Sequence, residues 1–376
     1  MPNPLDLDDG TSSTHISAET YVPVTSTQTS LNARASRVAT LPTIAWGERG
    51  AVLQDRSVPR YEATALLGEG GMGAVMSARD NDIGREVAVK RLRQEHPELL
   101  ARFVEEVRTV GQLEHPNIVP IHDAGVDDQG AFFVMKRVEG ESLDKIIEKL
   151  AAGDRETHRR FGFERRVEII RKVAEALRYA HAKGVVHRDI KPGNIHVGPM
   201  GEVFLLDWGI AQRAGHEEQA GQVIGTPLYM SPEQAAGAPV DARSDLYSLC
   251  VTLHEFLSLE HPYAKLETQA VLETIKTRKF PFVYLGARPV QGVTPWDLAW
   301  LVKKGVDADP SKRYRSADEL IRAIDDRAEG KVPIRCPITL TKRTSYEVMR
   351  LVTGYPRAYM GVMAALAGTA IWLAVR

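Results

Sequence analysis

The chain has only two cysteines among its 376 residues, Cys250 and Cys336. This pair offers neither a disulfide framework nor the ligand spacing of a zinc site, and it suits a reducing cytoplasm. An excess of one charge is also missing: 48 Lys+Arg against 49 Asp+Glu leave a net charge of -1, so nothing points to nucleic acid. The start of the chain lacks the basic and apolar pattern of a signal peptide, and there is no internal repeat. The length allows a two-lobed domain with extensions.

The most informative stretch, residues 185–209, reads VVHRDIKPGNIHVGPMGEVFLLDWG. Two short apolar runs bracket a polar loop, a pattern that predicts two strands around it. The loop and the position after the second run carry acids, cations and an amide at fixed spacing: His187, Arg188, Asp189, Lys191, Asn194 and Asp207. Phosphoryl transfer needs an acid for the nucleophile's proton, a cation near the phosphate and oxygen ligands for Mg²⁺. The pattern H-R-D-x-K-x-x-N followed by D-x-G is specific because many fixed residues coincide.

On these residues the chain resembles the serine/threonine protein kinases, in particular the bacterial eukaryotic-like ones. The resemblance covers about residues 61–328, predicted to be one kinase domain. It implies an α+β, two-lobed kinase fold with a small β-rich N-lobe and a larger helical C-lobe. It also implies that ATP and Mg²⁺ bind in the cleft, that proteins with Ser or Thr acceptors are the substrates, and that the chain signals and autophosphorylates. The alternative is a catalytically weak pseudokinase that acts as a membrane-tethered scaffold.

The resemblance also assigns roles within the catalytic stretch. Asp189 accepts the proton of the substrate hydroxyl and orients it, and Lys191 neutralises charge on the transferred phosphoryl group. Asn194 and Asp207 hold Mg²⁺ through oxygen ligands. His187 packs beneath the loop and has a structural role.

A glycine-rich segment opens the predicted domain. Gly68, Gly70, Gly73 and Val75 fit G-x-G-x-x-G-x-V, in which glycine lets the backbone approach phosphates. Dinucleotide-binding folds share the G-x-G-x-x-G pattern, but there a helix follows the glycines. Here a second strand, residues 85–90, follows instead, and no Gly-Lys-Ser/Thr sequence supports a Walker A loop.

Lys90 ends this second strand, where kinases place the lysine that anchors phosphate. Its expected partner is a glutamate on the next helix, predicted from apolar residues at helical spacing in residues 99–113. Glu106 matches the family position, and the neighbouring Glu105 is the alternative.

The resemblance places the adenine between a roof and a floor. Leu67, Val75 and Ala88 form the roof, Met135 is the gatekeeper, and the backbone of Lys136 and Val138 bonds the base. The floor position is His196, where the family usually has an apolar residue. A neutral imidazole can stack on a purine, but His196 is equally a surface residue if its strand is shifted by one position.

The activation segment runs from Asp207 to Ser231-Pro232-Glu233 and contains two departures from the family. Trp208 replaces the Phe of D-F-G, and residues 210–225 contain no Ser, Thr or Tyr. Arg188 therefore lacks the usual phosphate partner in this loop. One hypothesis is that Glu217 or Glu218 supplies the charge, and the other is that the loop is simply solvated.

Three further residues have expected roles by resemblance. Thr226, in Gly-Thr-Pro, belongs to the loop that docks the substrate. Asp245, on a predicted long apolar helix, braces the catalytic loop. Arg313 pairs with Glu233 as a buried ion pair that stabilises the large lobe.

The two ends of the chain differ from the domain. Residues 1–55 are rich in Ser, Thr and Pro and are predicted to be disordered, as a linker or as a tail of phosphoacceptors. Residues 329–357 form a basic linker, and the uncharged residues 358–375 predict a single transmembrane helix. The basic residues that precede this helix place the kinase domain in the cytoplasm, at the inner membrane. Small residues at Gly361, Ala365 and Gly368 allow a homodimer, and the competing interpretation is a helix packed on the domain or a partner.

Overall fold

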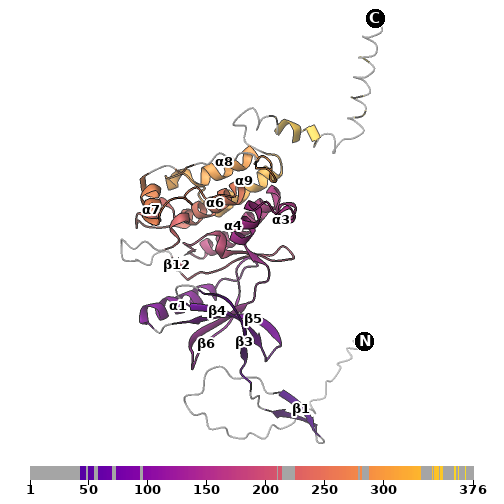
Figure 1. Cartoon of the computed structure of the whole chain (residues 1–376), viewed down its shortest axis with the longest axis vertical. Coiled ribbons are helices and arrows are strands. Elements are labelled where there is room, and N and C mark those ends of the chain that lie inside the picture. The colour runs from indigo at the N-terminus through magenta and orange to yellow at the C-terminus, as the bar shows by residue number, and fades with distance from the viewer. Residues whose placement is uncertain are drawn as a thin grey trace, which may run out of the picture.

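The computed structural model describes residues 43–47, 50–54, 58–69, 73–93, 96–209, 211–213, 225–277, 280–281 and 288–331, with positions 341, 343–346, 348–349, 360, 363 and 369. These residues form two lobes, one built on a sheet and one built from helices (Figure 1). The expected division into a small β-rich lobe and a larger helical lobe is confirmed.

The small lobe is a five-stranded antiparallel sheet with the strand order β3-β4-β5-β7-β6. Its strands are β3 Tyr61–Glu69, β4 Gly73–Asp80, β5 Arg85–Leu92, β6 Ile121–Asp127 and β7 Gly130–Lys136. Helix α1, Pro97–Val110, begins with proline at its first turn, where the missing N–H removes no helical hydrogen bond. Phe103 of α1 packs on Phe133 of β7, so the helix covers one face of the sheet.

The large lobe is mostly helical. Its helices are α2 Leu143–Ala151, α3 Arg155–Arg160, α4 Phe163–Ala182, α5 Pro232–Ala235, α6 Ala242–Ser258, α7 Thr268–Thr277, α8 Trp296–Gly305 and α9 Ala317–Ala328. Short 3-10 turns lie at η1 Pro192–Asn194, η2 Pro227–Tyr229 and η3 Pro310–Lys312. Helix α6 is buried along almost its whole length and contacts both α4 and α8, so it is the centre of this lobe.

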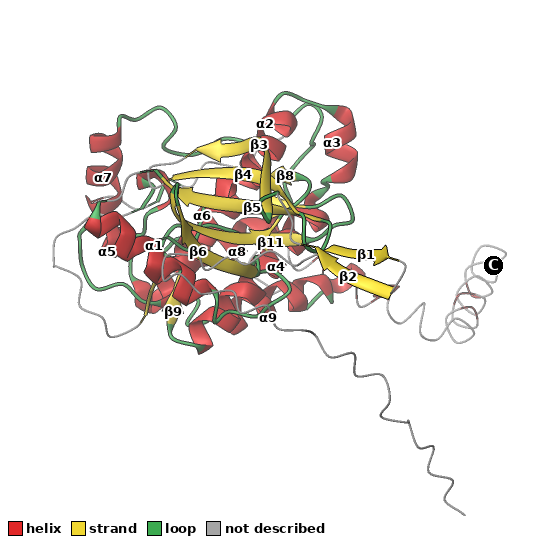
Figure 2. Ribbon diagram, turned by 90° about the horizontal axis from the view of Figure 1, so that it is seen from below, coloured by secondary structure: helices red, strands yellow, loops and turns green. Residues whose placement is uncertain are grey.

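Short strands lie in the large lobe near its junction with the small lobe. They are β8 Glu141–Ser142, β9 Val185–Val186, β10 Ile195–Val197, β11 Val203–Leu205 and β12 Gln212–Arg213. Figure 1 labels β12 at this junction, and Figure 2 shows β8, β9 and β11 in the view along the long axis. Strand β10 pairs with β11 and β8, and β9 pairs with β12. The polar loop between β9 and β10 is therefore held at the junction of the lobes.

One segment departs from the sequence-based expectations. Residues 1–55 were expected to be disordered, but β1 Thr43–Gly47 and β2 Gly50–Gln54 pair as an antiparallel hairpin. The β-branched and aromatic residues of TIAWG and the glycines at the turn favour a hairpin over the disorder predicted from the Ser/Thr-rich part. Helix α3, between α2 and α4, begins after the N-cap Asp154, whose side chain accepts a hydrogen bond from the backbone N–H of Thr157.

The predicted membrane span, residues 358–375, lies almost entirely outside the described residues, as does most of the basic linker. Within the part of the chain that is described, no helix combines the length and apolar character needed to cross a bilayer. The expected apolar C-terminal helix is thus not found among the described residues.

Candidate active site

A cavity of about 410 Å³ lies between the lobes and brings together residues that are far apart in the chain. The predicted nucleotide and metal residues that line it are Leu67, Gly68, Gly73, Val75, Ala88, Lys90, Glu106, Met135, Lys136, Val138, Asn194, His196 and Asp207. A Cβ atom on Gly73 would lie 2.1 Å from the carbonyl oxygen of Arg91, so only glycine fits there. Gly70 lies outside the described residues, as do Glu217 and Glu218.

Lys90 is held at one end of the cavity by two carboxylates. Its Nζ donates to both oxygens of Glu106, at 2.7 and 2.9 Å, and to Oδ1 of Asp207 at 3.2 Å. Burial opposes the charge on Lys90, but the two carboxylates outweigh it and raise the pKa of the amine above its ordinary value. Glu106 is buried against Lys90 whereas Glu105 is exposed, so the structure selects Glu106 from the two candidates.

Asp189 lies at the centre of a hydrogen-bonded group on the large-lobe side. Its Oδ2 accepts from Nζ of Lys191 at 2.7 Å, and its Oδ1 accepts from the hydroxyl of Thr226 at 2.9 Å. Lys191 also donates to Oγ1 of Thr226, at 2.7 Å. Burial alone would raise the pKa of Asp189, but these hydrogen bonds and the charge of Lys191 lower it below the ordinary value. The carboxylate is therefore ionised at neutral pH and accepts a hydrogen bond from the hydroxyl group beside it, that of Thr226.

Asn194 and Asp207 provide oxygen atoms that fit a divalent cation. The amide nitrogen of Asn194 donates to the backbone and side chain of Asp189, at 2.8 and 3.1 Å, which leaves its Oδ1 to face elsewhere. Asp207 has a half-exposed carboxylate, and both residues line the cavity. An amide oxygen and a carboxylate are the hard ligands that Mg²⁺ prefers.

The adenine end of the cavity is formed by the roof residues, the segment after β7 and β10. The N–H of Lys136 donates to the carbonyl oxygen of Pro120 at 3.1 Å, so this N–H is already used within the protein. A hydrogen bond between the backbone of Lys136 and a base would therefore have to use its carbonyl oxygen. Val138 and Met135 line the same wall.

Asp245 connects the core of the large lobe to the catalytic loop. Its carboxylate accepts from the N–H of His187 at 2.9 Å, from the N–H of Arg188 at 2.8 Å, and lies 2.7 Å from Nε2 of His181. The backbone angle φ is positive at Arg188 (70°) and at Asp207 (57°). Residues other than glycine seldom adopt such values. The hydrogen bonds to Asp245 thus stabilise the loop in this unfavourable backbone conformation.

Trp208 and His187 pack against each other under the loop. Trp208 is almost fully buried, and its ring centre lies 4.5 Å from that of His187. His187 is fully buried and its Nε2 lies 3.1 Å from the carbonyl oxygen of Leu206. Burial lowers the pKa of His187, so the ring is neutral and acts in packing.

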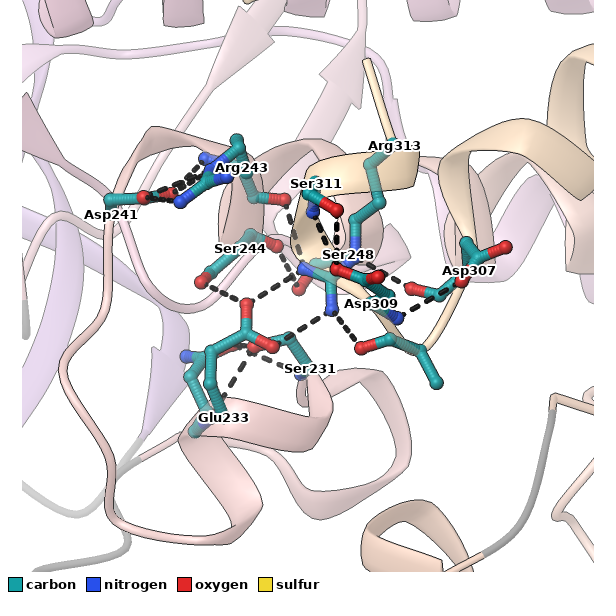
Figure 3. Close-up of polar contacts among 12 residues, drawn as sticks. Ser231, Glu233, Asp241, Arg243, Ser244, Ser248, Asp307, Asp309, Ser311 and Arg313 are labelled. Atoms are coloured by element: carbon teal, nitrogen blue, oxygen red, sulfur yellow. Dashed lines mark hydrogen bonds and ion pairs between the residues drawn. The ribbon is translucent and has the colours of Figure 1, made fainter. Parts of the chain in front are cut away.

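Glu233 and Arg313 form a buried pair away from the cavity (Figure 3). Both nitrogens of the guanidinium fork reach Glu233, at 2.7 and 2.8 Å. The remaining donors reach the carbonyl oxygens of Asp307, Ala308 and Arg243, and Ser244 donates to Glu233. Burial would raise the pKa of Glu233, but Arg313 outweighs it and lowers this pKa.

The sequence-based reasoning missed residues that support the site from outside the motifs. His181 approaches Asp245, Gln234 donates to the carbonyl oxygen of Arg188 at 2.8 Å, and Asn117 donates to the carbonyl oxygen of Val203 at 2.8 Å. Asn117 ties the loop after α1 to the large lobe. Its place in His-Pro-Asn, directly after the predicted helix, was the available signal for this role.

The fold and the site together define a two-lobed protein in which a lysine–glutamate pair in one lobe faces an aspartate-centred loop in the other. The model of the protein kinase domain matches residues 61–323, well over half of the chain. The chain therefore belongs to the protein kinase domain family. Among curated proteins it is similar to bacterial serine/threonine kinases, as the sequence motifs indicated.

Three relatives illustrate this similarity. The serine/threonine-protein kinase PknD of Protochlamydia amoebophila is 34% identical over 75% of this chain and 31% of its own length. PknA of Mycobacterium tuberculosis is 36% identical, over 73% of this chain and 63% of its own. A probable serine/threonine-protein kinase of Streptomyces coelicolor is 38% identical, over 72% of this chain and 40% of its own length. The aligned part thus spans between about one third and just under two thirds of these relatives.

Proposed function

We propose that this chain transfers the γ-phosphoryl group of ATP to Ser and Thr hydroxyls of proteins. The observation that carries the proposal is the contact of Asp189 with a threonine hydroxyl and with Lys191, beside Lys90 and Asp207. An ionised aspartate that already accepts from a hydroxyl is suited to accept from a substrate hydroxyl. The similarity to bacterial serine/threonine kinases supports the choice of acceptor.

In the proposed reaction the substrate oxygen attacks the γ-phosphorus while its proton passes to Asp189. The bond between the γ-phosphorus and the bridging oxygen breaks, and ADP leaves with the electron pair. Lys191 lies within hydrogen-bond reach of Asp189 and stabilises negative charge near the transferred group. Lys90, oriented by Glu106, binds the non-transferred phosphates.

Asn194 and Asp207 are proposed to hold Mg²⁺, which neutralises phosphate charge when bound. Trp208 fixes the chain next to Asp207, because its buried ring cannot leave without opening the core beneath the catalytic loop. The aromatic replacement in D-W-G is therefore compatible with a metal ligand at Asp207.

The test is transfer of labelled phosphate from ATP, with Mg²⁺, to the chain itself and to a generic basic protein. We expect label on Ser or Thr with the wild type and a loss of about 100-fold or more with Asp189→Asn, which keeps the shape but not the base. Mass spectrometry locates the acceptors, including any among the Ser and Thr residues of positions 1–42.

The pseudokinase alternative makes the opposite prediction in the same assay. Binding of ATP without transfer, unchanged by Asp189→Asn, would favour a scaffold. Equal labelling by wild type and variant would show a contaminating kinase and remove the proposal's support.

A second proposal rests on the sequence beyond the domain. Residues 358–375 carry no charge, and Lys342, Arg343, Arg350 and Arg357 precede them. This arrangement favours a membrane anchor with the kinase domain in the cytoplasm. Extraction of the full chain should then need detergent, and deletion of the residues after Tyr355 should remove that need. A full chain that is soluble without detergent would contradict the anchor.

A further inference from the structure

An exposed apolar patch lies in the loop before α8 and at the start of that helix. Its members are Val290, Val293 and Trp296, which are 45%, 63% and 36% exposed, and we call them the α8 patch. Paired backbone hydrogen bonds between Arg288 and Gly292, at 3.1 and 2.9 Å, hold the loop in a turn. A single exposed apolar side chain is ordinary on a protein surface, whereas a cluster of them indicates an interaction site.

The α8 patch lies next to the point at which the chain leaves the kinase domain. Asp297, which follows Trp296, accepts a hydrogen bond from Nε of Arg327 in the last turn of α9. Gly330 closely follows α9, and a Cβ atom on it would lie 2.1 Å from Cγ of Tyr346, so the tyrosine ring packs on the glycine. Figure 1 shows α8 and α9 at the end of the large lobe that is farther from the small lobe. The chain therefore leaves the domain from this end.

Exposed arginines of α3 lie beside the α8 patch. A Cβ atom on Gly153, just before α3, would lie 3.7 Å from Cγ2 of Val290, so these two segments lie side by side. Arg155 and Arg159 of α3 are exposed, and neither forms an ion pair with a described carboxylate. Their charge is available to a partner, next to an apolar surface that contains a tryptophan.

The surface of a lipid bilayer is the partner that fits this combination. Tryptophan has an apolar ring and a polar N–H, which suit the boundary between acyl chains and headgroups, and arginine binds the phosphate groups of anionic lipids. One turn further along α8, Nζ of the exposed Lys303 lies 4.8 Å from the ring centre of the half-buried Trp300. Another protein would also cover the valines, but the place where the chain continues towards the basic linker and the uncharged residues 358–375 favours the bilayer.

We propose that the α8 patch and the arginines of α3 dock the large lobe on the surface of a bilayer that carries anionic lipids. The tryptophan and the valines enter the interfacial region, and the arginines face the headgroup phosphates. The inference rests on the proposed membrane anchor, because a span at residues 358–375 keeps this end of the lobe close to the bilayer. It goes further in giving the domain one face towards the membrane, while the cavity between the lobes stays accessible to protein substrates.

The test places an environment-sensitive fluorophore on the α8 patch of the full chain. Val293→Cys carries the label and Cys336→Ser removes a competing thiol, whereas Cys250 stays unlabelled because it is buried, which raises the pKa of its thiol to about 12. The chain is reconstituted in phosphatidylcholine vesicles without or with about 30% phosphatidylglycerol. We expect stronger, blue-shifted emission with the anionic lipid. A label at Val126→Cys in the small lobe, a site that is 61% exposed, should not respond.

Removal of the arginines measures the contribution of charge. Arg155→Ala combined with Arg159→Ala should lower the ratio of docked to undocked domain by roughly 25-fold, since each basic residue near an anionic surface contributes about a factor of five. The matched control combines Arg79→Ala with Arg102→Ala, which removes the same charge from exposed positions of the small lobe and should leave the ratio unchanged. Salt at about 1 M should weaken the docking of the wild type, because it screens these charges.

Trp296→Gln measures the contribution of the apolar patch. The variant removes the ring that enters the interface and should lower the ratio of docked to undocked domain by about threefold or more. The melting temperature of each variant shows whether the large lobe is still folded. The arginine variants change exposed side chains only, so they keep the test decisive if Trp296→Gln unfolds.

The outcomes separate the docking from the anchor and from catalysis. A chain that floats with both kinds of vesicle but gives no response at Val293 would overturn the docking and leave the anchor in place. Flotation with anionic vesicles alone, with the response at Val293, would support the docking and contradict the anchor. An emission change that depends on protein concentration but not on anionic lipid would show a protein contact on the patch and overturn the inference. Phosphate transfer is not a readout, so its absence would contradict only the proposed reaction.

Discussion

Two buried ion pairs in this chain have similar chemistry but different surroundings. Lys90 and Glu106 join β5 to α1 in the small lobe, and Lys90 also reaches Asp207 across the cavity. Arg313 and Glu233 lie wholly within the large lobe, where every N–H donor of the guanidinium has an oxygen partner (Figure 3). The first pair lines a cavity and spans two lobes, whereas the second is closed on all sides.

The difference indicates what each pair contributes. A closed network contributes to the stability of the fold. Removing one member lowers the free energy of unfolding strongly, because the other charge stays buried without its partner. A pair at a cavity can exchange protein contacts for ligand contacts, so its removal lowers ligand affinity and the turnover number. Lys90 already divides its hydrogen bonds between two carboxylates that come from different lobes, which is consistent with the second role.

The largest effect should come from opening the closed pair. Arg313→Ala leaves Glu233 buried without its partner and should lower the free energy of unfolding by about 3–5 kcal/mol. Urea unfolding of the full chain measures this change. Arg243→Ala is the matched control, because its pair with Asp241 is largely exposed and is expected to contribute about 0.2–1 kcal/mol. Similar losses in free energy of unfolding in both variants would show that the buried network contributes no more to stability than the exposed pair does.

The pair at the cavity should respond in activity more than in stability. Lys90→Met and Glu106→Gln should each lower kcat/KM for ATP by roughly 100-fold or more, as removal of an oriented charged group does in other active sites. The double variant should lose little beyond either single one, since the two residues act as a unit. If the losses in kcat/KM of the two single variants added up in the double variant, Glu106 and Lys90 would act independently and the prediction would be wrong.

The smallest effect is a pH dependence that distinguishes the pairs. The pKa of Glu233 is lowered in the folded state, so its stabilising contribution is present above the unfolded pKa of about 4.3 and is lost as pH falls through the folded value. The free energy of unfolding of wild type should therefore fall between about pH 5 and pH 3. Glu233→Gln should be less stable at neutral pH and show a shallower fall. If the free energy of unfolding of wild type and Glu233→Gln fell in parallel with pH, Glu233 would not be the source of the pH dependence.

Much of the site was predictable because its motifs are local. The residues between His187 and Asp207 lie in one stretch of chain, so their spacing alone brings Asp189, Lys191 and Asn194 close together. The distant contact of Lys90 with Glu106 also followed, through the order of strand and helix and the family resemblance. Apolar residues at helical spacing located α1, and a long apolar run located α6, which packs in the core of the large lobe.

Contacts that depend on tertiary packing could not be predicted in this way. His181 and Gln234 support the catalytic loop from α4 and α5, yet neither residue type nor spacing marks them in the sequence. The hairpin β1–β2 was missed because a short pair of strands has little periodicity beside a long polar tail. The register of β10, which decides where His196 points, needed the pairing partners on both sides.

The left-handed backbone at Arg188 and Asp207 bears on how this protein can be engineered. Each of these conformations is unfavourable for a residue with a Cβ, by roughly 1–2 kcal/mol. Arg188 directly precedes Asp189, and Asp207 lines the nucleotide cavity. A selection scored only on heat resistance would reward glycine at either position. Such a search would gain stability by removing the Arg188 guanidinium or the Asp207 carboxylate, so any screen of this chain has to measure turnover as well as heat resistance.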